Sequence, residues 1–121
     1  GLGFQDIIIE RDFECGNNFL TSLEGCPKIV KRDFDCNDNK LVSLKDIHKH
    51  VHEIGGNIYL EGNQITSHVL GLLKIKRLRA VRMSNNPNIE QIINRHLRGG
   101  RNLLACQEEM MDAGLDDFAQ L

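Results

Sequence analysis

The chain has 121 residues, of which 40% are hydrophobic and 26% are charged, and its formal net charge is −2. This size and composition favour one compact domain over several. No apolar run approaches the roughly 18 to 20 residues that span a bilayer, and the N-terminal Gly-Leu-Gly-Phe lacks the basic start and apolar core of a signal peptide, so we expect a cytoplasmic protein that has no membrane partner.

The first ten residues are predicted to cap the N-terminal end of the core. Phe4 and the apolar run Ile7-Ile8-Ile9 supply hydrophobic side chains for that role. Residues 1–10 therefore form a predicted N-terminal cap segment, which precedes the patterned part of the chain.

Residues 11–100 contain an internal repetition. The motif Asp12-Phe13-Glu14-Cys15 returns 21 residues later as Asp33-Phe34-Asp35-Cys36. At the same offset, Asn18, Leu20, Ser22 and Leu23 match Asn39, Leu41, Ser43 and Leu44. Weaker copies follow at offsets of 24 and 23 residues, through Ile58, Leu60, Asn63 and Ile65 and then through Val81, Met83 and Asn86. The sequence thus predicts four repeats over 11–100.

Each predicted repeat begins with a short strand and then returns. Alternation places Phe13 and Cys15 on one side of the first strand and the acidic residues on the other. The asparagine that follows, such as Asn39, is expected to bond backbone groups where the strand turns away. Residues 45–54 and 66–79 are richer in helix formers, so we expect these two segments to return as short helices.

The pattern becomes helical after the fourth predicted strand. Ile89, Ile93 and Leu97 lie at three-to-four spacing, and Gly99-Gly100 ends that segment. A second helical pattern begins at Leu103. We expect residues 101–121 to form a C-terminal helical cap, because a stack of repeats would otherwise expose its last apolar face and strand edge.

These motifs resemble a known repeat family. The pattern Phe34-x-Cys36-x-x-Asn39-x-Leu41-x-x-Leu44 is similar to the leucine-rich repeat, with Phe and Cys in two of its Leu positions. The pattern of residues 18–27 looks more like the short repeats of bacteria and bacteriophages. The resemblance implies an α/β fold, namely a short leucine-rich-repeat solenoid with parallel strands and a C-terminal helical cap. It also implies a binding role, such as a phage or bacterial protein that modulates a host factor.

The strand side that faces away from the core carries mostly carboxylates. Parallel strands lie about 4.8 Å apart, so Asp12 would lie beside Asp33. Such like-charge neighbours cost about a few tenths of a kcal/mol each, and a basic protein partner would offset this cost. The predicted partner-binding residues are Asp12, Glu14, Asp33, Asp35, Tyr59, Glu61 and Arg82. Two alternatives are that the carboxylates only keep the sheet soluble and unpaired, or that they bind a cation.

Residues 74–101, which we call the basic belt, carry eight Lys or Arg and one acidic residue. Nucleic-acid binding is therefore an alternative function, since clustered cations release counterions when they bind phosphate. Its candidate residues are Lys74, Lys76, Arg77, Arg79 and Arg82. The chain has no Trp and one Tyr, so stacking platforms for bases are lacking, and we do not expect nucleic acid to be the main partner.

The sequence gives little support to metal or nucleophile chemistry. Cys15, Cys26, Cys36 and Cys106 show no close pairing, so we expect free thiols rather than disulfides or a zinc site. His48 and His52 would share a face of a helix, but no third ligand at suitable spacing completes a site. We expect a non-enzymatic protein-interaction module that has no catalytic residues, metal or cofactor.

Self-association is a further alternative. Residues 102–121 carry five acidic residues and no Lys or Arg, so this tail could contact the basic belt of another copy. We expect a monomer or a weak homo-oligomer, with an accessory module of a larger assembly as the remaining possibility.

Overall fold

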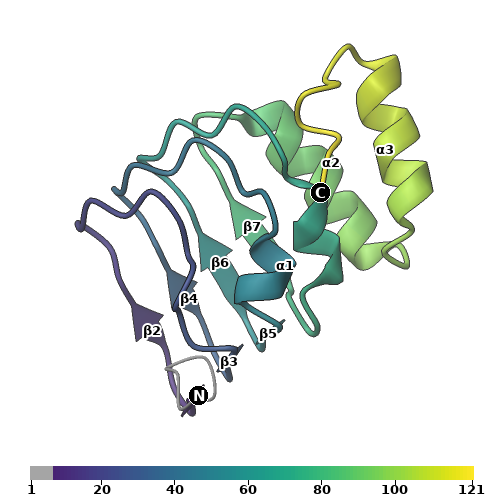
Figure 1. Ribbon diagram of the computed structural model, residues 1–121. Helices are drawn as coiled ribbons and strands as arrows, with labels where there is room; N and C mark the ends of the chain where they lie inside the picture. Colours follow the sequence, from purple (N-terminus) through teal and green to yellow (C-terminus); the bar gives the residue numbers. More distant parts are fainter. Residues whose placement is uncertain (1–6) are drawn as a thin grey trace.

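A computed structural model describes residues 7–121 and shows a mixed α/β chain with parallel strands. Four strands form one sheet in the order β2 (Phe13–Glu14), β4 (Phe34–Asp35), β6 (Asn57–Tyr59) and β7 (Ala80–Arg82). They lie side by side along the molecule (Figure 1). These are the four strands that the alternation predicts, and the expected α/β class with parallel strands is confirmed.

The strands pair at the offsets found in the sequence. Phe13 is the partner of Phe34, Phe34 of Ile58, and Ile58 of Val81. The rings of Phe13 and Phe34 pack with their centroids 5.2 Å apart. Residues that match in the sequence thus lie next to one another across the sheet.

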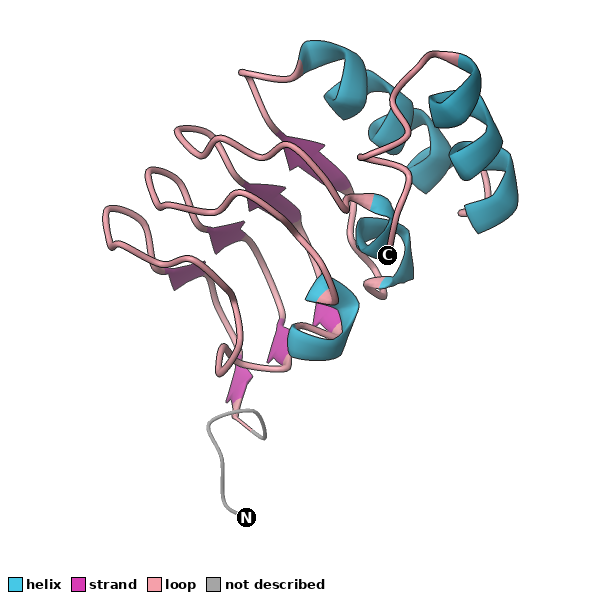
Figure 2. Cartoon of the chain, turned by 45° about the horizontal axis from the view of Figure 1, so that its top comes forward, coloured by secondary structure: helices cyan, strands magenta, loops and turns pink. Residues whose placement is uncertain are grey.

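The chain also forms a second parallel sheet, which the sequence did not predict and which loops separate from the four-stranded sheet. It contains β1 (Ile8–Ile9), β3 (Ile29–Val30) and β5 (Glu53–Ile54). Figure 2 shows its strands as a separate row joined to the first sheet by loops. Ile8–Ile9 and Ile29–Val30 are pairs of adjacent apolar residues and give no alternation signal. Glu53–Ile54 lies in a segment that was expected to be helical, so none of these strands was predicted.

The returning segments are only partly helical. Within 45–54, the helix α1 covers Ile47–His50, and the expectation of a helix is wrong for residues 53–54, which form β5. Within 66–79, the 3-10 helix η2 covers Leu70–Lys74. The two short helices pack together at Gly71, where a Cβ atom would lie 2.8 Å from Nδ1 of His48. The absence of a side chain at Gly71 therefore allows this close packing.

Two longer helices confirm the helical pattern that the sequence predicts for the C-terminal part. They are α2 (Pro87–Arg98) and α3 (Leu103–Asp112). The helical expectation is wrong for residues 113–121, which form turns and coil. Helix α2 begins inside the range 11–100, and Pro87 occupies its first turn, where a missing N–H costs nothing. No helix among residues 7–121 is long and apolar enough to cross a membrane.

Helix α2 covers the outer edge of β7. The Asn94 side chain accepts a hydrogen bond from the Val81 N–H at 2.8 Å and donates one to the Val81 carbonyl at 3.0 Å. The Glu90 carboxylate accepts one from the Met83 N–H at 2.6 Å. Side chains thus satisfy backbone groups that an open strand edge would expose.

Of the predicted N-terminal cap, Phe4 lies outside the described residues. Ile8 and Ile9 form β1, and only Ile9 packs against the core, so the expectation that the whole apolar run covers the first repeat is wrong for the exposed Ile7 and Ile8.

Buried asparagines bond the turns that follow the strands. The Asn39 side chain accepts from the Leu20 N–H at 3.0 Å and donates to the Cys15 and Cys36 carbonyls at 3.0 and 3.2 Å. The expectation that such asparagines serve backbone groups is confirmed here and at Asn63. Asn86, the last asparagine of the series, makes a single bond of this kind: its side chain donates to the Ile65 carbonyl at 3.1 Å.

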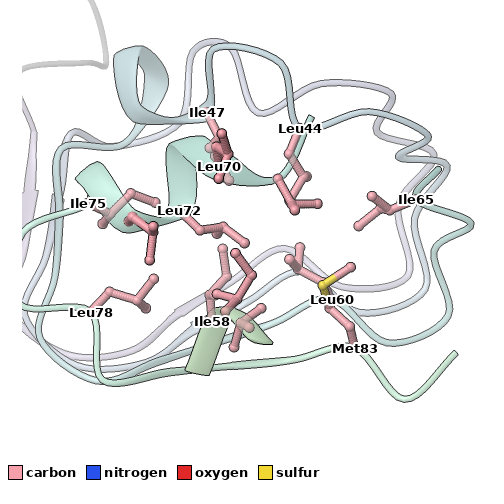
Figure 3. Close-up of a cluster of buried hydrophobic side chains, with 14 of the residues drawn as sticks. Leu44, Ile47, Ile58, Leu60, Ile65, Leu70, Leu72, Ile75, Leu78 and Met83 are labelled. Carbon is pink, nitrogen blue, oxygen red and sulfur yellow. The ribbon is translucent and has the colours of Figure 1, made fainter. Parts of the chain in front are cut away.

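The hydrophobic core lies between the four-stranded sheet and the returning segments (Figure 3). The sheet side contributes Ile58, Leu60 and Met83, all fully buried. The returning side contributes Ile47 and Leu72, which close the core from the opposite direction. One core therefore joins elements that are far apart in the sequence.

Candidate binding surfaces

The four-stranded sheet exposes one row of unlike side chains. Strand pairing places Glu14 next to Asp35, Asp35 next to Tyr59, and Tyr59 next to Arg82. Glu14 and Arg82 are exposed, and Asp35 and Tyr59 are half-buried. We call this side of the sheet the strand face. The row runs from a carboxylate at β2, through an aromatic ring at β6, to a guanidinium at β7.

Two predicted partner-binding residues have partners within the chain. The Asp12 Oδ1 accepts a hydrogen bond from the Asp33 N–H at 2.9 Å, and the Asp33 Oδ1 accepts one from the Asn57 N–H at 2.8 Å. Gly56 leaves room for this contact, since a Cβ atom there would lie 2.2 Å from the Asp33 Oδ1. Asp12 also lies 3.9 Å from the Arg32 Nε. These acids therefore bond backbone N–H groups of the neighbouring strand, a role that the sequence analysis did not assign.

Asp35 and Asn37, farther along the chain, also accept hydrogen bonds from backbone N–H groups. The Asp35 Oδ1 accepts from the Asn37 N–H at 3.0 Å, and the Asn37 Oδ1 accepts from the Glu61 N–H at 2.8 Å. The like-charge cost that suggested a basic partner is thus offset inside the fold for Asp12, Asp33 and Asp35. The bonds of Asp12 and Asp33 depend on the position of the next strand, so no local motif predicts them, whereas the Asp35 bond is made two residues along its own segment.

The remaining predicted partner-binding residues make fewer contacts with other side chains of the chain. Within 7–121, no ion pair involves Glu14, Glu61 or Arg82. The Tyr59 hydroxyl accepts a hydrogen bond from the Asn57 Nδ2 at 3.3 Å. These four side chains are the part of the predicted site that is available to a partner.

The basic belt does not form one continuous surface. Arg95 donates two hydrogen bonds to the Glu109 carboxylate, at 2.8 and 2.7 Å, and His96 Nε2 lies 2.8 Å from the same carboxylate. The bonds from Arg95, and then that from His96, lower the pKa of Glu109 to about 2. Arg95 therefore serves to join α2 to α3. Arg82 lies on the strand face, away from this contact.

The other cations of the belt gather around two open hollows. One, of about 690 Å³, is lined by Arg77, Arg79, Arg98 and Arg101, with Leu78 and Leu97 among its apolar residues. The other, of about 430 Å³, is lined by Lys74 and Lys76 and shares Arg77 and Arg101 with the first. The structure thus brings together four of the five residues predicted for nucleic-acid binding, and it adds Arg98 and Arg101.

The histidine pair that could share a helix face is separated. Helix α1 ends at His50, and the backbone at Val51 is extended, so His52 lies outside the helix. The buried Nδ1 of His48 has no hydrogen-bond partner among the described residues. Burial, followed by the charge of Lys74, lowers the pKa of His48. This ring is therefore best accommodated neutral, as a packing residue against Gly71.

Three cysteines that are distant in sequence lie close together. A hydrogen bond with Cys26 lowers the pKa of Cys15, but the hydrogen bond with Cys36 and burial outweigh it and raise the pKa to about 12. The hydrogen bond with Cys15, together with burial, raises the pKa of Cys26. All three are free thiols, as predicted. Their proximity to one another was not predicted, because it depends on strand pairing.

Cys106 lies in α3 and is fully buried. Burial, and then the nearby Glu109 carboxylate, raises the pKa of Cys106 to about 11. A thiol with this pKa is protonated at neutral pH and is a weak nucleophile. Its position identifies it as a core side chain between the two C-terminal helices.

Comparisons with protein-family models, curated proteins and solved structures find no match to the chain.

Proposed function

We propose that this protein is a short leucine-rich-repeat solenoid that acts as a non-enzymatic binding module, and that its strand face binds a partner protein. The fold part of the proposal is supported by strand pairing at the offsets of the sequence motif and by the bonds of Asn39 and Asn63. A stack of this kind presents its parallel strands as one surface, which repeat proteins use for recognition.

The observation that carries the functional part is the row Glu14, Asp35, Tyr59 and Arg82 across four strands. An aromatic side chain flanked by opposite charges suits protein recognition, in which buried aromatic and Arg side chains supply much of the affinity. The row has polarity, with a carboxylate at β2 and a guanidinium at β7. It fits a partner surface that carries a basic group opposite Glu14 and an acidic group opposite Arg82.

The intrachain bonds of the carboxylates refine the choice of residues. Asp12 and Asp33 bond the neighbouring strand and Asp35 bonds the turn after its own strand, so changing them would confound loss of binding with loss of folding. Glu14, Tyr59, Glu61 and Arg82 are the contacts that we assign to the partner.

The test is an affinity capture from lysate of the source cell or its host with matched baits. The Glu14→Lys/Tyr59→Ala variant alters the strand face. The Glu24→Lys/Phe19→Ala variant makes the same chemical changes at exposed positions outside the strands. We expect the native chain and the second variant to retain one protein that the first variant loses.

The recovered partner is then titrated against all three chains by calorimetry. The Tyr59 and Glu14 changes together are expected to weaken binding by about 100-fold, which corresponds to the loss of an interface hot spot. Equal affinity for the two double variants, when both are folded by circular dichroism, would show that the strand face is not the binding surface.

A further inference from the structure

Two hollows beside the starts of β6 and β7 are lined by cations, most of which make no ion pair among the described residues. Lys74, Lys76, Arg77, Arg79, Arg98 and Arg101 line them. Among the described residues, no carboxylate lines either hollow. Like charges at this density repel one another, and a bound anion would offset that repulsion.

One of these cations is held in place by the backbone. The Arg101 guanidinium donates to the Ile75 carbonyl at 2.7 Å and to the Leu78 carbonyl. It is half-buried, and burial lowers the pKa of this group, although an arginine remains charged at neutral pH. Since Arg101 lines both hollows, a fixed positive charge stands where they join.

The other cations are largely available. Arg77 lies with its Nε 3.7 Å from Oε2 of Glu53, an oxygen that also lies 3.8 Å from the Lys31 Nζ. Within residues 7–121, no ion pair involves Lys74, Lys76, Arg79 or Arg98. Of the six cations, only Arg77 pairs with a carboxylate in the described part of the chain, and four of the others are exposed.

The shape of the cluster favours a small anion over an extended strand. A nucleic acid needs a track of cations, but Arg95 is occupied by Glu109, and Arg82 lies on the strand face. Among residues 7–121, no aromatic side chain lines either hollow, so bases would find no stacking partner there. The arginines are grouped around one open hollow, where a guanidinium can bind two oxygens of one phosphate.

From this arrangement, we propose that the joined hollows bind a small polyphosphate anion through Arg79, Arg98, Arg101 and the lysines at 74 and 76. The binding groups recognise phosphate oxygens and make no contact specific to a base. Inorganic triphosphate and the triphosphate of a nucleotide therefore share the chemistry that the site selects. This site uses residues other than Glu14, Tyr59 and Glu61, so it stands independently of the partner-binding proposal.

The experiment is a calorimetric titration of the full chain with inorganic triphosphate, ATP and an oligothymidylate of about 12 nucleotides, at about 20 and about 150 mM salt. We expect saturable binding of one triphosphate per chain that weakens as salt rises. ATP is expected to bind with an affinity within about threefold of that of triphosphate, since its base adds no contact. If ATP bound more tightly than this, the site would select a nucleotide, and the proposal that it recognises phosphate oxygens alone would be wrong.

Matched variants locate the site. Arg79→Gln and Arg98→Gln remove exposed cations that make no hydrogen bond with their side chains in the described region, and each is expected to weaken triphosphate binding by about tenfold. Lys40→Gln makes the same charge change at an exposed position far from the hollows and should leave the affinity within about twofold.

Three results would overturn the proposal. They are the absence of saturable binding at low salt, equal weakening by Lys40→Gln and Arg79→Gln, and tighter binding of the oligothymidylate than of triphosphate. The last result would instead identify a nucleic-acid surface. Circular dichroism melting of each variant checks that the fold is intact, so that loss of binding is not confused with unfolding.

Discussion

The Oδ1 atom of Asn63 accepts a hydrogen bond from the Leu41 N–H at 3.0 Å and so joins two turns of the chain that are 22 residues apart. The Nδ2 of the same side chain donates to the Cys36 and Leu60 carbonyls at 3.0 and 3.1 Å. The side chain is 1% exposed. One buried amide thus satisfies backbone groups from two neighbouring turns, which water cannot reach.

Replacement of Asn63 by Ala is expected to lower the free energy of unfolding by about 3 kcal/mol, because it leaves a buried N–H and two carbonyls with fewer partners. Urea unfolding followed by circular dichroism measures the change. The matched control is Asn18→Ala, since Asn18 is exposed and donates only to the nearby Cys15 and Gly16 carbonyls. The control should lose less than about 1 kcal/mol, and equal losses would contradict a special role for the buried amide.

The Asp33 carboxylate offers a second test, which separates its charge from its hydrogen bond. The Asp33→Asn variant keeps an oxygen that can accept from the Asn57 N–H, whereas Asp33→Ala removes it. We expect Asn to preserve stability within about 0.5 kcal/mol and Ala to lose about 1–2 kcal/mol in urea unfolding. If Asn proved as damaging as Ala, the negative charge of Asp33, and not its hydrogen bond to the Asn57 N–H, would be what stabilises the sheet.

The junction of α2 and α3 should weaken in acid. Hydrogen bonds from Arg95 and His96 lower the pKa of Glu109 from 4.5 to about 2. A carboxylate whose pKa is lower in the folded state stabilises the fold fully above its unfolded pKa, and this contribution is lost as the pH falls. The loss should therefore extend from about pH 4.5 toward pH 2.

Melting temperatures of the native chain and Glu109→Gln test this dependence. The native chain should melt higher at pH 7, and the difference should shrink as the pH falls from about 4.5 toward 2. Glu108→Gln is the control, since Glu108 is exposed and adjacent and takes part in no ion pair within 7–121. A difference between native and Glu109→Gln that does not change with pH would show that the carboxylate contributes by packing alone.

Much of the sheet could be predicted because its signals are local. Phe13 and Phe34 alternate with acidic residues, and the motifs recur at an offset that equals the strand pairing. Asn39 and Asn63 could be predicted for the same reason, as each follows its strand at a constant spacing. The second sheet could not be predicted, since a pair such as Ile29–Val30 has no periodicity and is defined only by its neighbours.

The candidate surfaces were predictable as regions but not in their detail. The charge of Asp33 is visible in the sequence, but its bond to the Asn57 N–H depends on the pairing of two strands. The basic belt is equally visible, yet the sequence does not show that Arg95 is occupied by Glu109 while Arg98 lines a hollow. Proximity of this kind arises from tertiary packing, so it appears only once the chain is folded.

The last residues of the chain bond back to its middle. The Leu121 carbonyl accepts from the Asp46 N–H at 2.9 Å, and the carbonyls of residues 117 and 118 accept from the N–H groups of residues 68 and 69, each at 3.0 Å. Residues 117–121 thus act as a clasp across the N-terminal ends of α1 and η2. Their carbonyls accept from N–H groups that such short helices cannot satisfy internally, so a distant segment supplies the caps that the local sequence lacks.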